Sequence, residues 1–477
     1  MADVIKTQLL INNQLVPAGD NGTFDLFSPH TGDLVAKVAE ATIDDVNNAV
    51  EAAQAAFPAW SALSPQQRGA PLKKLAEMHI AEKDELARLD AISMGKPVST
   101  HGIDVNYAVT QYNYFAEAAY PQGHTSLNSP GFLNMSLRQP FGVVAVIIPW
   151  NAPLIFFAKK VAPALAAGNC VVSWKVSQWI EKCGFPPGVI NVLSGHGQVS
   201  GQALSEHMRV RALSFTGSTR TGRAIAIAAA KSNLKKVVFE LGGKSPALIF
   251  EDADIEQAAK ETELSINSNS GQACFASSRI YVQESIKEKF VEAFTRVAKA
   301  RKLGDPTVPG VNQGPQADRT QYNTVQKFIA LGKDDAGSTI DTGADSTNND
   351  ISPNHIHPVI FTDVPEDSKI AKEEIFGPVV IINTFSTESE AIAKANDTEF
   401  GLYASLYTKD IERALRVAKK LESGMLGVNC TSPTNSWDLP FGGWKGSGTG
   451  RESLLDSMDH YLEHKSVYVR VNGIGGQ

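Results

Sequence analysis

Stretches of continuous apolar residues alternate along the chain with stretches of helical periodicity. Residues 143–148 are all apolar, as expected of a strand that is buried on both faces of a parallel sheet. The same pattern predicts further strands in two series. The first series comprises 143–148, 170–174, 189–193, 212–215 and 237–240, and the second comprises 247–250, 280–282, 379–385, 402–407 and 425–428.

Helices are predicted between these strands. Thr42 and Asp45 have the spacing of a capping box at the start of an apolar-periodic stretch. Pro153 suits the first turn of a helix that ends before Gly168, and residues 286–300 carry an apolar stripe on one helix face. Strands and helices that alternate in this way predict a doubly wound α/β architecture in two units.

Three stretches fall outside these two units. The polar residues 333–350 predict a surface loop. Residues 122–141 and 464–471 have the pattern of extended strands, although they are remote in sequence. They form either a peripheral sheet or a contact between copies of the chain, and the sequence leaves both interpretations open. The break between the two units is expected near Gly242 and Gly243.

Composition limits the class of protein. Hydrophobic residues make up 43% and charged residues 20% of the 477 residues, which is typical of a soluble globular protein with two or three domains. The net charge of −7 is small and the charges are interspersed, so neither nucleic acid nor an anionic membrane surface is expected as a partner. The N-terminal residues lack the apolar core of a signal peptide, so the expected location is cytoplasmic.

The four cysteines, at positions 170, 183, 274 and 430, show no CxxC spacing and predict neither a disulfide framework nor a metal site. Cys274 differs from the others because its segment, SNSGQACFASSR (268–279), is polar and rich in small residues. A helix predicted at 254–267 ends just before it and places Cys274 on a turn. A single cysteine is usually a small buried hydrophobe, whereas partial exposure and donors that favour the thiolate indicate a nucleophile.

Three further polar groups lie where predicted strands end. Residues 215–222, FTGSTRTG, form a glycine-rich turn before a helix, where free N–H groups can bind phosphate. Glu240 ends a strand and is either half of an ordinary ion pair or a general base with a raised pKa. Asn151 follows the strand at 143–148 and either caps a helix or stabilises an oxyanion. Their combination with Cys274 favours an active site over four separate structural roles.

These motifs resemble those of the aldehyde dehydrogenase superfamily, the NAD(P)-dependent enzymes that make carboxylic acids. The motifs are PWNAP (149–153), FTGSTRTGR (215–223), FELGGKSP (239–246), NSGQAC (269–274), EEIFGPV (373–379) and PFGGWKGSGTGRE (440–452). The resemblance covers almost the whole chain and implies a Rossmann-like NAD(P)-binding domain beside an α/β catalytic domain. Its implied boundaries are 1–121 and 142–242 for the cofactor domain, 243–446 for the catalytic domain, and 122–141 with 447–477 for bridging segments.

The resemblance implies that Cys274 is the nucleophile that attacks the aldehyde carbon. The Asn151 amide and the Cys274 backbone N–H then hold the oxyanion, and Glu240 activates the water that hydrolyses the thioester. Relatives that pass the acyl group to coenzyme A typically lack this carboxylate, so Glu240 favours hydrolysis. A coenzyme A-acylating semialdehyde dehydrogenase and a catalytically weak family member remain as alternatives.

The resemblance also implies a cofactor site for NAD or NADP, and it slightly favours NAD as the cofactor. Glu374 corresponds to the residue that holds the nicotinamide ribose, and Phe376 is expected near the nicotinamide ring. The other implied cofactor-binding residues are Trp150, Lys175, Gly217, Ser218, Gly222 and Leu241. Relatives of this kind are homodimers or homotetramers, and the same is expected here.

The aldehyde pocket is expected to contain Ala152, Ile155, Lys159 and Phe441. Ala152 is small at a position where many relatives carry an aromatic residue, which widens the pocket. Lys159 stands where many relatives carry tryptophan. Either its positive charge favours an acidic aldehyde, or its side chain simply points to solvent, and the sequence does not decide between these alternatives.

One segment departs from the family pattern. After the strand at 170–174, relatives carry Lys-Pro-x-Glu and a long helix, whereas this chain reads WKVSQWIEKCGFPPGV (174–189). Residues 175–183 leave room for a helix of at most ~14 Å. Ser177 or Gln178 replaces the glutamate that binds the ribose hydroxyls and repels a 2′-phosphate in relatives. The choice between NAD and NADP is therefore open.

Overall fold

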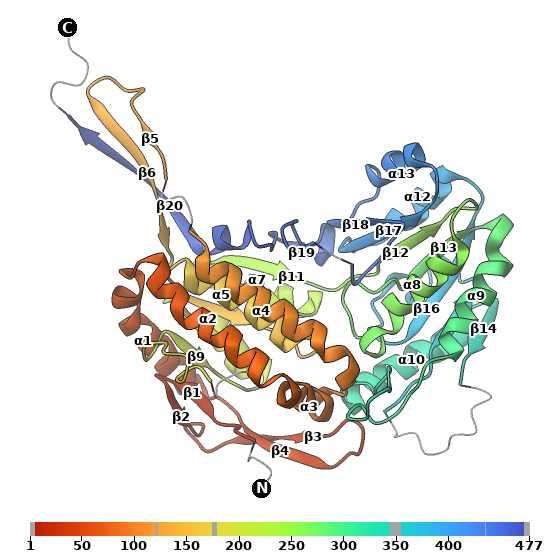
Figure 1. Ribbon diagram of the computed structural model, residues 1–477, viewed down its shortest axis with the longest axis horizontal. Coiled ribbons are helices and arrows are strands. Elements are labelled where there is room, and N and C mark those ends of the chain that lie inside the picture. Colours follow the sequence, from red (N-terminus) through yellow and green to blue (C-terminus); the bar gives the residue numbers. More distant parts are fainter. Residues whose placement is uncertain (1–4, 120–122, 174–178, 344–353, 435, 472–477) are drawn as a thin grey trace.

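The computed structural model describes the chain except for residues 1–4, 120–122, 174–178, 344–353, 435 and 472–477. Figure 1 shows two α/β lobes side by side and a narrow arm of strands that projects from one of them. Each lobe is built around one large sheet, in which most neighbouring strands are parallel. The mixed α/β class agrees with the prediction from the sequence.

The sheet of the first lobe, here called the cofactor lobe, has eight strands. In spatial order they are β19 (Gly448–Thr449), β11 (Lys236–Glu240), β10 (Val210–Thr216), β7 (Val143–Ile147), β8 (Cys170–Ser173), β9 (Ile190–Val192), β1 (Leu9–Ile11) and β2 (Gln14–Val16). The strands from β11 to β9 are parallel and confirm the first predicted series. The edge strands β19, β1 and β2 run antiparallel to their neighbours.

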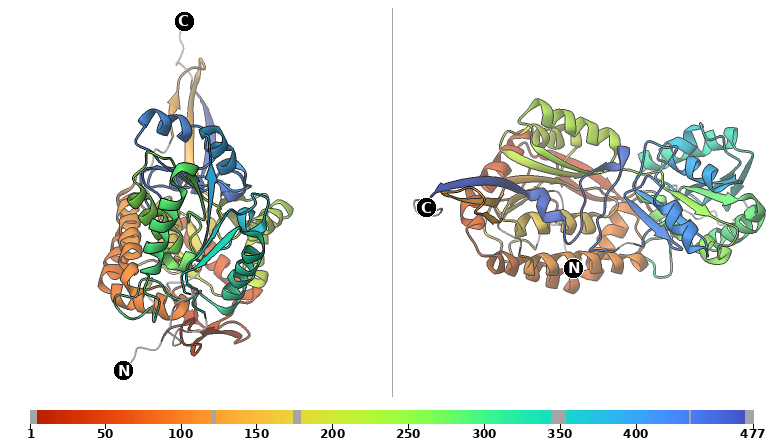
Figure 2. Two further views of the ribbon diagram at one scale, coloured as in Figure 1. Left: turned by 90° about the vertical axis from the view of Figure 1, so that its right-hand side faces the viewer. Right: turned by 90° about the horizontal axis from the view of Figure 1, so that it is seen from above.

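Helices cover both faces of this sheet. Helices α1 (Ile43–Ser61) and α5 (Pro153–Ala166) pack on β7 and β8, and α7 (Thr219–Lys231) packs on β11. Figure 2 shows α7 on one side of the sheet and α2 (Pro65–Ala81) and α4 (His101–Glu117) on the other. Because both faces are covered, β7 is buried except at its last residue, as its continuous apolar sequence predicts.

The second lobe, here called the catalytic lobe, contains a seven-stranded sheet. In spatial order its strands are β14 (Ser338–Asp341), β15 (Val359–Thr362), β16 (Val379–Phe385), β13 (Arg279–Gln283), β12 (Pro246–Ile249), β17 (Tyr403–Tyr407) and β18 (Met425–Val428). All neighbours are parallel except β14, which runs antiparallel to β15. The second predicted series is thus confirmed.

The principal helix boundaries follow the sequence signals. At the start of α1, the Thr42 hydroxyl accepts a hydrogen bond from the Asp45 N–H, and the Asp45 carboxylate accepts one from the Thr42 N–H. This is the predicted capping box. Pro153 is the first residue of α5, also as predicted.

The remaining elements are shorter or more peripheral. The other α-helices are α3 (Lys83–Met94), α6 (Gln202–Glu206), α8 (Ile255–Asn267), α9 (Lys287–Lys299), α10 (Arg319–Asp335), α11 (Lys369–Lys372), α12 (Glu388–Asn396) and α13 (Ile411–Ala418). The short 3₁₀ turns are η1 (Val98–Thr100), η3 (Ser268–Gly271), η4 (Glu284–Ile286), η5 (Lys445–Ser447) and η6 (Ser457–Tyr461), and η2 (Gly197–Gly201) is a π-helical turn. Strands β3 (Thr23–Phe27) and β4 (Leu34–Ala39) form a separate antiparallel pair.

The arm consists of three antiparallel strands from two distant parts of the chain. Strand β6 (Phe132–Pro140) pairs along its whole length with β20 (Leu462–Arg470), and β5 (Thr125–Ser126) pairs with the other edge of β6. Figures 1 and 2 show that the arm extends away from both lobes. The two segments predicted as extended strands therefore lie in one small sheet.

Two sequence predictions are corrected by the structure. The stretch 333–350 is not entirely loop, because α10 continues to Asp335 and Ser338–Asp341 form strand β14. No helix forms in the described part of the short crossover, since residues 179–184 are turns. Trp179 is instead buried there against His79 of α2, with ring centroids 5.7 Å apart. Packing on α2 thus takes the place of helix formation.

The two lobes are joined by the chain itself and by hydrogen bonds between loops. Residues 241–245 run from β11 into β12 and connect the two sheets directly. The N–H of Val98 donates to the Pro306 carbonyl at 2.9 Å, and the Ser99 hydroxyl donates to the Val311 carbonyl at 2.7 Å. These bonds fix the cofactor lobe to the segment between α9 and α10 of the catalytic lobe.

Candidate active site

Cys274 lies on a turn at the boundary between the lobes. Helix α8 ends at Asn267, and the backbone of Asn269 and Ser270 is left-handed, with φ values of 49° and 59°. Gly271 also has a positive φ of 78°, and a side chain there would come within 2.0 Å of the Gly377 carbonyl carbon. Only glycine fits this close approach. The turn predicted for the NSGQAC motif is therefore present, and it leaves the Cys274 side chain half-buried.

Asn151 reaches this turn from the cofactor lobe. It follows β7, and its buried side-chain amide donates a hydrogen bond to the Gln272 carbonyl at 2.9 Å. The Asn269 amide donates in return to the Asn151 carbonyl at 3.2 Å. Two predicted site residues, Asn151 and Cys274, are thereby brought to one place from different lobes.

The surroundings of Cys274 favour the neutral thiol. Burial raises the pKa of Cys274 to about 12, and the negative charges of Glu374 and Glu240 act in the same direction. Lys159 opposes this shift. In the free protein the thiol form is therefore favoured mainly by burial, and the nearby carboxylates add to that effect. Proton removal from Cys274 needs a base or a change in these charges.

Glu240, the last residue of β11, is buried beside the same site. Among the described residues neither carboxylate oxygen has a hydrogen-bond partner. Burial raises the pKa of Glu240 to about 8, and the charge of Glu452 adds to that rise. With this pKa the carboxyl group is mostly protonated at pH 7 and half-ionised near pH 8, so it can both donate and accept a proton.

Glu452 is a site residue that the sequence analysis did not assign. Its side chain is buried. The carboxylate accepts a 2.6 Å hydrogen bond from Lys160 Nζ and a 3.4 Å hydrogen bond from the Ser214 hydroxyl. Burial opposes its ionisation, but Lys160 and Lys159 lower the pKa of Glu452 below its usual value. The only signals for this cluster were two lysines in an apolar helix and the glutamate that ends the PFGGWKGSGTGRE motif.

Tyr107 is a second residue that the sequence analysis missed. Burial raises its pKa well above the usual value, and the charges of Glu452 and Glu240 contribute to the rise. Its ring contacts Trp437 edge to face, with centroids 5.8 Å apart. Helix α4 thus places an aromatic hydroxyl beside the two buried carboxylates.

Two of the four residues predicted for the aldehyde pocket, Lys159 and Phe441, are in contact with each other. Lys159 is 3% exposed, so the interpretation that it points to solvent is wrong. Its Nζ lies 3.3 Å from the centroid of the Phe441 ring, and Phe441 contacts Phe275 with centroids 6.4 Å apart. Phe275 follows Cys274, so Phe441 and Lys159 lie beside the thiol segment. Ala152 and Ile155 are half-buried at the start of α5.

The turn between β10 and α7 has the features of a phosphate site. A side chain at Gly217 would come within 2.4 Å of the Phe215 ring, and one at Gly222 within 2.9 Å of Leu241. Ser218 is the N-cap of α7 and accepts a hydrogen bond from the Thr221 N–H at 3.3 Å. The two glycines therefore allow close packing of the turn at the N-terminus of α7, where N–H groups can bind an anion.

An aromatic pair and a carboxylate complete the predicted cofactor site. Trp150 of the cofactor lobe and Phe376 of the catalytic lobe meet edge to face, with centroids 5.6 Å apart. Glu374 accepts a 2.9 Å hydrogen bond from the Gly243 N–H, and burial raises the pKa of Glu374 to about 7. Lys175 lies outside the described residues. A phosphate-binding turn, an acceptor for ribose hydroxyls and a partly exposed aromatic face together fit a dinucleotide.

A group of three buried side chains has metal-ligand chemistry. In the described part of the chain, ligand atoms of Asp90, His101 and Asp104 lie within 4.8 Å of one another. The Lys96 ammonium contacts Asp104 directly, so a cation of the chain itself already compensates this cluster. The group is remote from the predicted catalytic residues in sequence.

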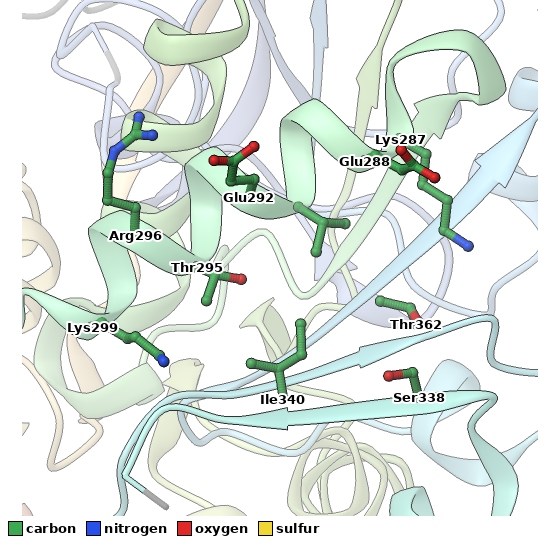
Figure 3. A pocket seen from close by; sticks show the side chains of 10 residues that line it. Lys287, Glu288, Glu292, Thr295, Arg296, Lys299, Ser338, Ile340 and Thr362 are labelled. Carbon is green, nitrogen blue, oxygen red and sulfur yellow. The ribbon is translucent and has the colours of Figure 1, made fainter. Parts of the chain in front are cut away.

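A groove on the catalytic lobe is separate from this site. It has a volume of about 750 Å³ and runs between α9 and strands β14 and β15. Figure 3 shows charged side chains of α9 along one side and Ser338, Ile340 and Thr362 along the other. None of the predicted site residues lines it.

Comparison with known proteins agrees with this arrangement. The model of the aldehyde dehydrogenase family matches residues 16–467. An aldehyde dehydrogenase of Agaricus bisporus is 41% identical over 98% of this chain and 96% of its own length. Two solved structures each match 98% of this chain with 36% sequence identity. Aldehyde dehydrogenase KauB from Pseudomonas aeruginosa is matched over 97% of its own chain with a TM-score of 0.94. The indole-3-acetaldehyde dehydrogenase AldA from P. syringae is matched over 98% of its own chain with a TM-score of 0.92.

The AldA structure is a complex with NAD+. Over the described residues, no helix of the present chain has both the length and the hydrophobicity needed to cross a bilayer. Fold, family match and close relatives agree over nearly the full length. The chain therefore belongs to the aldehyde dehydrogenase family and is an NAD(P)-dependent oxidoreductase.

Proposed function

We propose that this protein oxidises an aldehyde to its carboxylic acid with NAD(P)+, through a thioester on Cys274 that water hydrolyses. The observation that carries the proposal is the meeting of Asn151 and Glu240 of one lobe with Cys274 of the other. A nucleophile, an amide donor and a buried carboxyl group at one place are the set that acyl transfer through a thioester requires.

The first step is attack of the Cys274 sulfur on the aldehyde carbon. Because its pKa is about 12 in the free protein, the thiol must pass its proton to a neighbouring base as it attacks. Glu240 accepts that proton in its ionised form, since its own pKa is about 8. The resulting oxyanion is held by the Asn151 side-chain amide and the Cys274 backbone N–H.

The predicted cofactor residues hold NAD(P) beside the thiol. Gly217, Ser218 and the N-terminus of α7 bind the pyrophosphate, and Glu374 binds the nicotinamide ribose. The cofactor, when bound there, supplies the hydride acceptor for oxidation of the thiohemiacetal to the thioester. Trp150 and Phe376 position the ring and exclude water from its face.

Hydrolysis of the thioester is the second half-reaction. Once Glu240 has lost the proton of the thiol to solvent, it takes a proton from the water that attacks the acyl carbon. The carboxylic acid is released, and that proton returns to the departing Cys274 sulfur. Burial and the charge of Glu452 raise the pKa of Glu240, and the charges of Lys159 and Lys160 oppose that rise.

Two rival activities differ from this one in the fate of the thioester. A coenzyme A-acylating enzyme transfers the acyl group to a thiol, and a catalytically weak member forms little thioester. The buried Glu240 favours hydrolysis over both, because it is a base placed beside the acyl carbon. Production of NADH without coenzyme A distinguishes hydrolysis from acylation.

The three parts of the chain have separate roles in this proposal. Residues 1–121 and 142–242 bind the cofactor, residues 243–446 supply the thiol, and 122–141 with 447–477 join copies of the chain. The arm supports the last role, because Tyr468 is 72% and Leu127 is 62% exposed on a sheet that contacts neither lobe along most of its length. We propose a homodimer or homotetramer in which the arm packs against another copy.

The nucleophile is tested by Cys274→Ser. An alkoxide forms far less readily than a thiolate, so NADH production should be abolished while the thermal unfolding transition is kept. Cys430→Ser is the matched control, because Cys430 is also half-buried and free but belongs to no predicted site. Activity of the Cys274→Ser protein above a few per cent of the parent value would mean that another residue is the nucleophile.

A further inference from the structure

Two consecutive lysines of α5 have different environments. Lys159 and Lys160 are both buried, at 3% and 0% exposure. The Lys160 ammonium donates to Glu452 at 2.6 Å and to the Ser214 hydroxyl at 2.8 Å, so its donors are largely satisfied. Lys159 makes no hydrogen bond within the described chain, and its contacts are a 3.5 Å ion pair with Glu452 and the face of Phe441.

A buried ammonium without hydrogen bonds is costly. Only a small part of Lys159 stays accessible, and an aromatic face replaces only part of the solvation that its three N–H donors lose. The Glu452 oxygen nearest to Lys159, at 3.5 Å, has no hydrogen-bond partner among the described residues. Lys159 thus has donor capacity that no group of the described chain uses.

The charge around Glu240 is also unbalanced. Lys159, Lys160 and Arg451 act on Glu240 as cations, and Glu452 is the opposing carboxylate. Arg451 is bonded to neutral carbonyls, at 3.0 Å for Gly443 and 2.7 Å for Gly450. Three positive charges therefore face two carboxylates even when Glu240 is ionised. Glu374, the third carboxylate near the thiol, is assigned to the cofactor and is not among the charges that shift the pKa of Glu240.

The position of the unused cation identifies the molecule that it can bind. Lys159 contacts Phe441, which packs against Phe275, the residue after Cys274, and its charge lowers the pKa of both Cys274 and Glu240. Its place against Phe441 puts it in the wall of the predicted aldehyde pocket. A ligand that fills this space must have an aldehyde carbon at Cys274 and an anionic group a few atoms away.

We propose that the preferred substrate is a short aldehyde that carries a carboxylate, and that Lys159 binds this carboxylate. The inference rests on the proposed aldehyde oxidation and adds the substrate class to it. The substrate carboxylate satisfies the donors of Lys159 and neutralises the excess positive charge. Long apolar aldehydes gain neither interaction and leave the ammonium buried without a partner.

The test compares two substrates that differ in one charge. Succinic semialdehyde carries a carboxylate, and its methyl ester has nearly the same shape without the charge. For the unaltered protein, kcat/KM with NAD should be about 10- to 100-fold higher for the acid than for the ester, the effect of one charged hydrogen bond. In Lys159→Gln this ratio should collapse towards one, whereas Lys159→Arg should keep most of it. Lys289→Gln removes an exposed lysine of α9 as the matched control and should keep the ratio.

A second measurement does not depend on turnover or on a variant. Succinate should protect Cys274 of the unaltered protein from alkylation by iodoacetamide, and succinamide at the same concentration should not. Equal protection by both, or a ratio that survives in Lys159→Gln, overturns the assignment of Lys159. Oxidation of the ester in preference to the acid overturns the substrate class but leaves the proposed function standing. No NADH or NADPH from either substrate overturns the proposed function itself.

Discussion

The side-chain amide of Asn151 donates a 2.9 Å hydrogen bond to the main-chain carbonyl of Gln272, two residues before Cys274. The donor belongs to the cofactor lobe and the acceptor to the catalytic lobe. The same amide is therefore both a link between the lobes and the donor proposed for the oxyanion.

Replacement of Asn151 by Ala removes this donor. We expect kcat to fall by about 10²–10³-fold with a smaller change in KM, since the oxyanion develops only in the transition state. Steady-state kinetics measures the split, and thermal unfolding checks that the lobes remain folded together. A loss that appears only in KM would assign Asn151 to substrate binding instead.

Replacement of Glu240 by Gln separates the two half-reactions. The amide takes a proton neither from the thiol nor from water, so thioester formation should slow, but hydrolysis should slow more and the thioester should persist. Rapid mixing should show a burst of NADH close to one equivalent per site, followed by very slow turnover. Turnover equal to that of the unaltered protein would show that another group activates the water.

The pH profile of hydrolysis follows from the same carboxyl group. The pKa of Glu240 is raised to about 8, and its base form is the active one, so the rate should rise as pH increases through that value. Substrate binding shifts the value observed in kcat, so the comparison uses single-turnover thioester decay from pH 6 to 9.5. In Glu240→Gln the residual decay should lose this step, which distinguishes Glu240 from hydroxide acting alone.

The short crossover predicts weak and poorly selective cofactor binding. Without the expected glutamate, the ribose hydroxyls lose a charged acceptor, which costs about 1.5–3 kcal/mol, or roughly a 10- to 100-fold loss of affinity. Calorimetry should therefore give weak and similar affinities for NAD and NADP. A family-length helix inserted after Lys175, with Glu three residues beyond it, should tighten NAD alone. Low-micromolar binding of NAD to the unaltered chain would show that the short crossover is harmless.

The proposed role of the arm is tested through its exposed aromatic residue. Tyr468→Glu places a charge where we expect an apolar contact with another copy, so light scattering should detect smaller assemblies. Lys465→Glu, which also adds negative charge to β20, is the matched control for charge alone. If both variants keep the mass of the unaltered protein, the arm does not join copies.

The interior strands could be predicted because burial on both faces leaves a continuous apolar sequence. Strand β7 is the clear case. Strands at the rim carry less information: β14 has exposed ends, and its sequence Ser-Thr-Ile-Asp reads as part of a polar loop. Its pairing with β15 is decided by tertiary contact and not by periodicity.

The residues of the candidate site also differ in how far the sequence could indicate them. Cys274, Asn151 and Glu240 lie at element ends, where polar residues after apolar strands attract notice. Glu452 does not, because its partner Lys160 is 292 residues away and neither residue is unusual in its local sequence. The environment of Lys159 was equally hidden, since a lysine in a helix is compatible with solvent until the facing residues are known.

The division of the site between two lobes has a consequence for refolding. Each sheet can form from its own stretch of the chain, except that β19 returns from beyond the catalytic lobe to pair with β11. Secondary structure and tryptophan burial can therefore recover while Asn151, Glu240 and Cys274 are still apart. After dilution from denaturant, enzyme activity should return later than circular dichroism, and the lag between them measures how fast the lobes find each other.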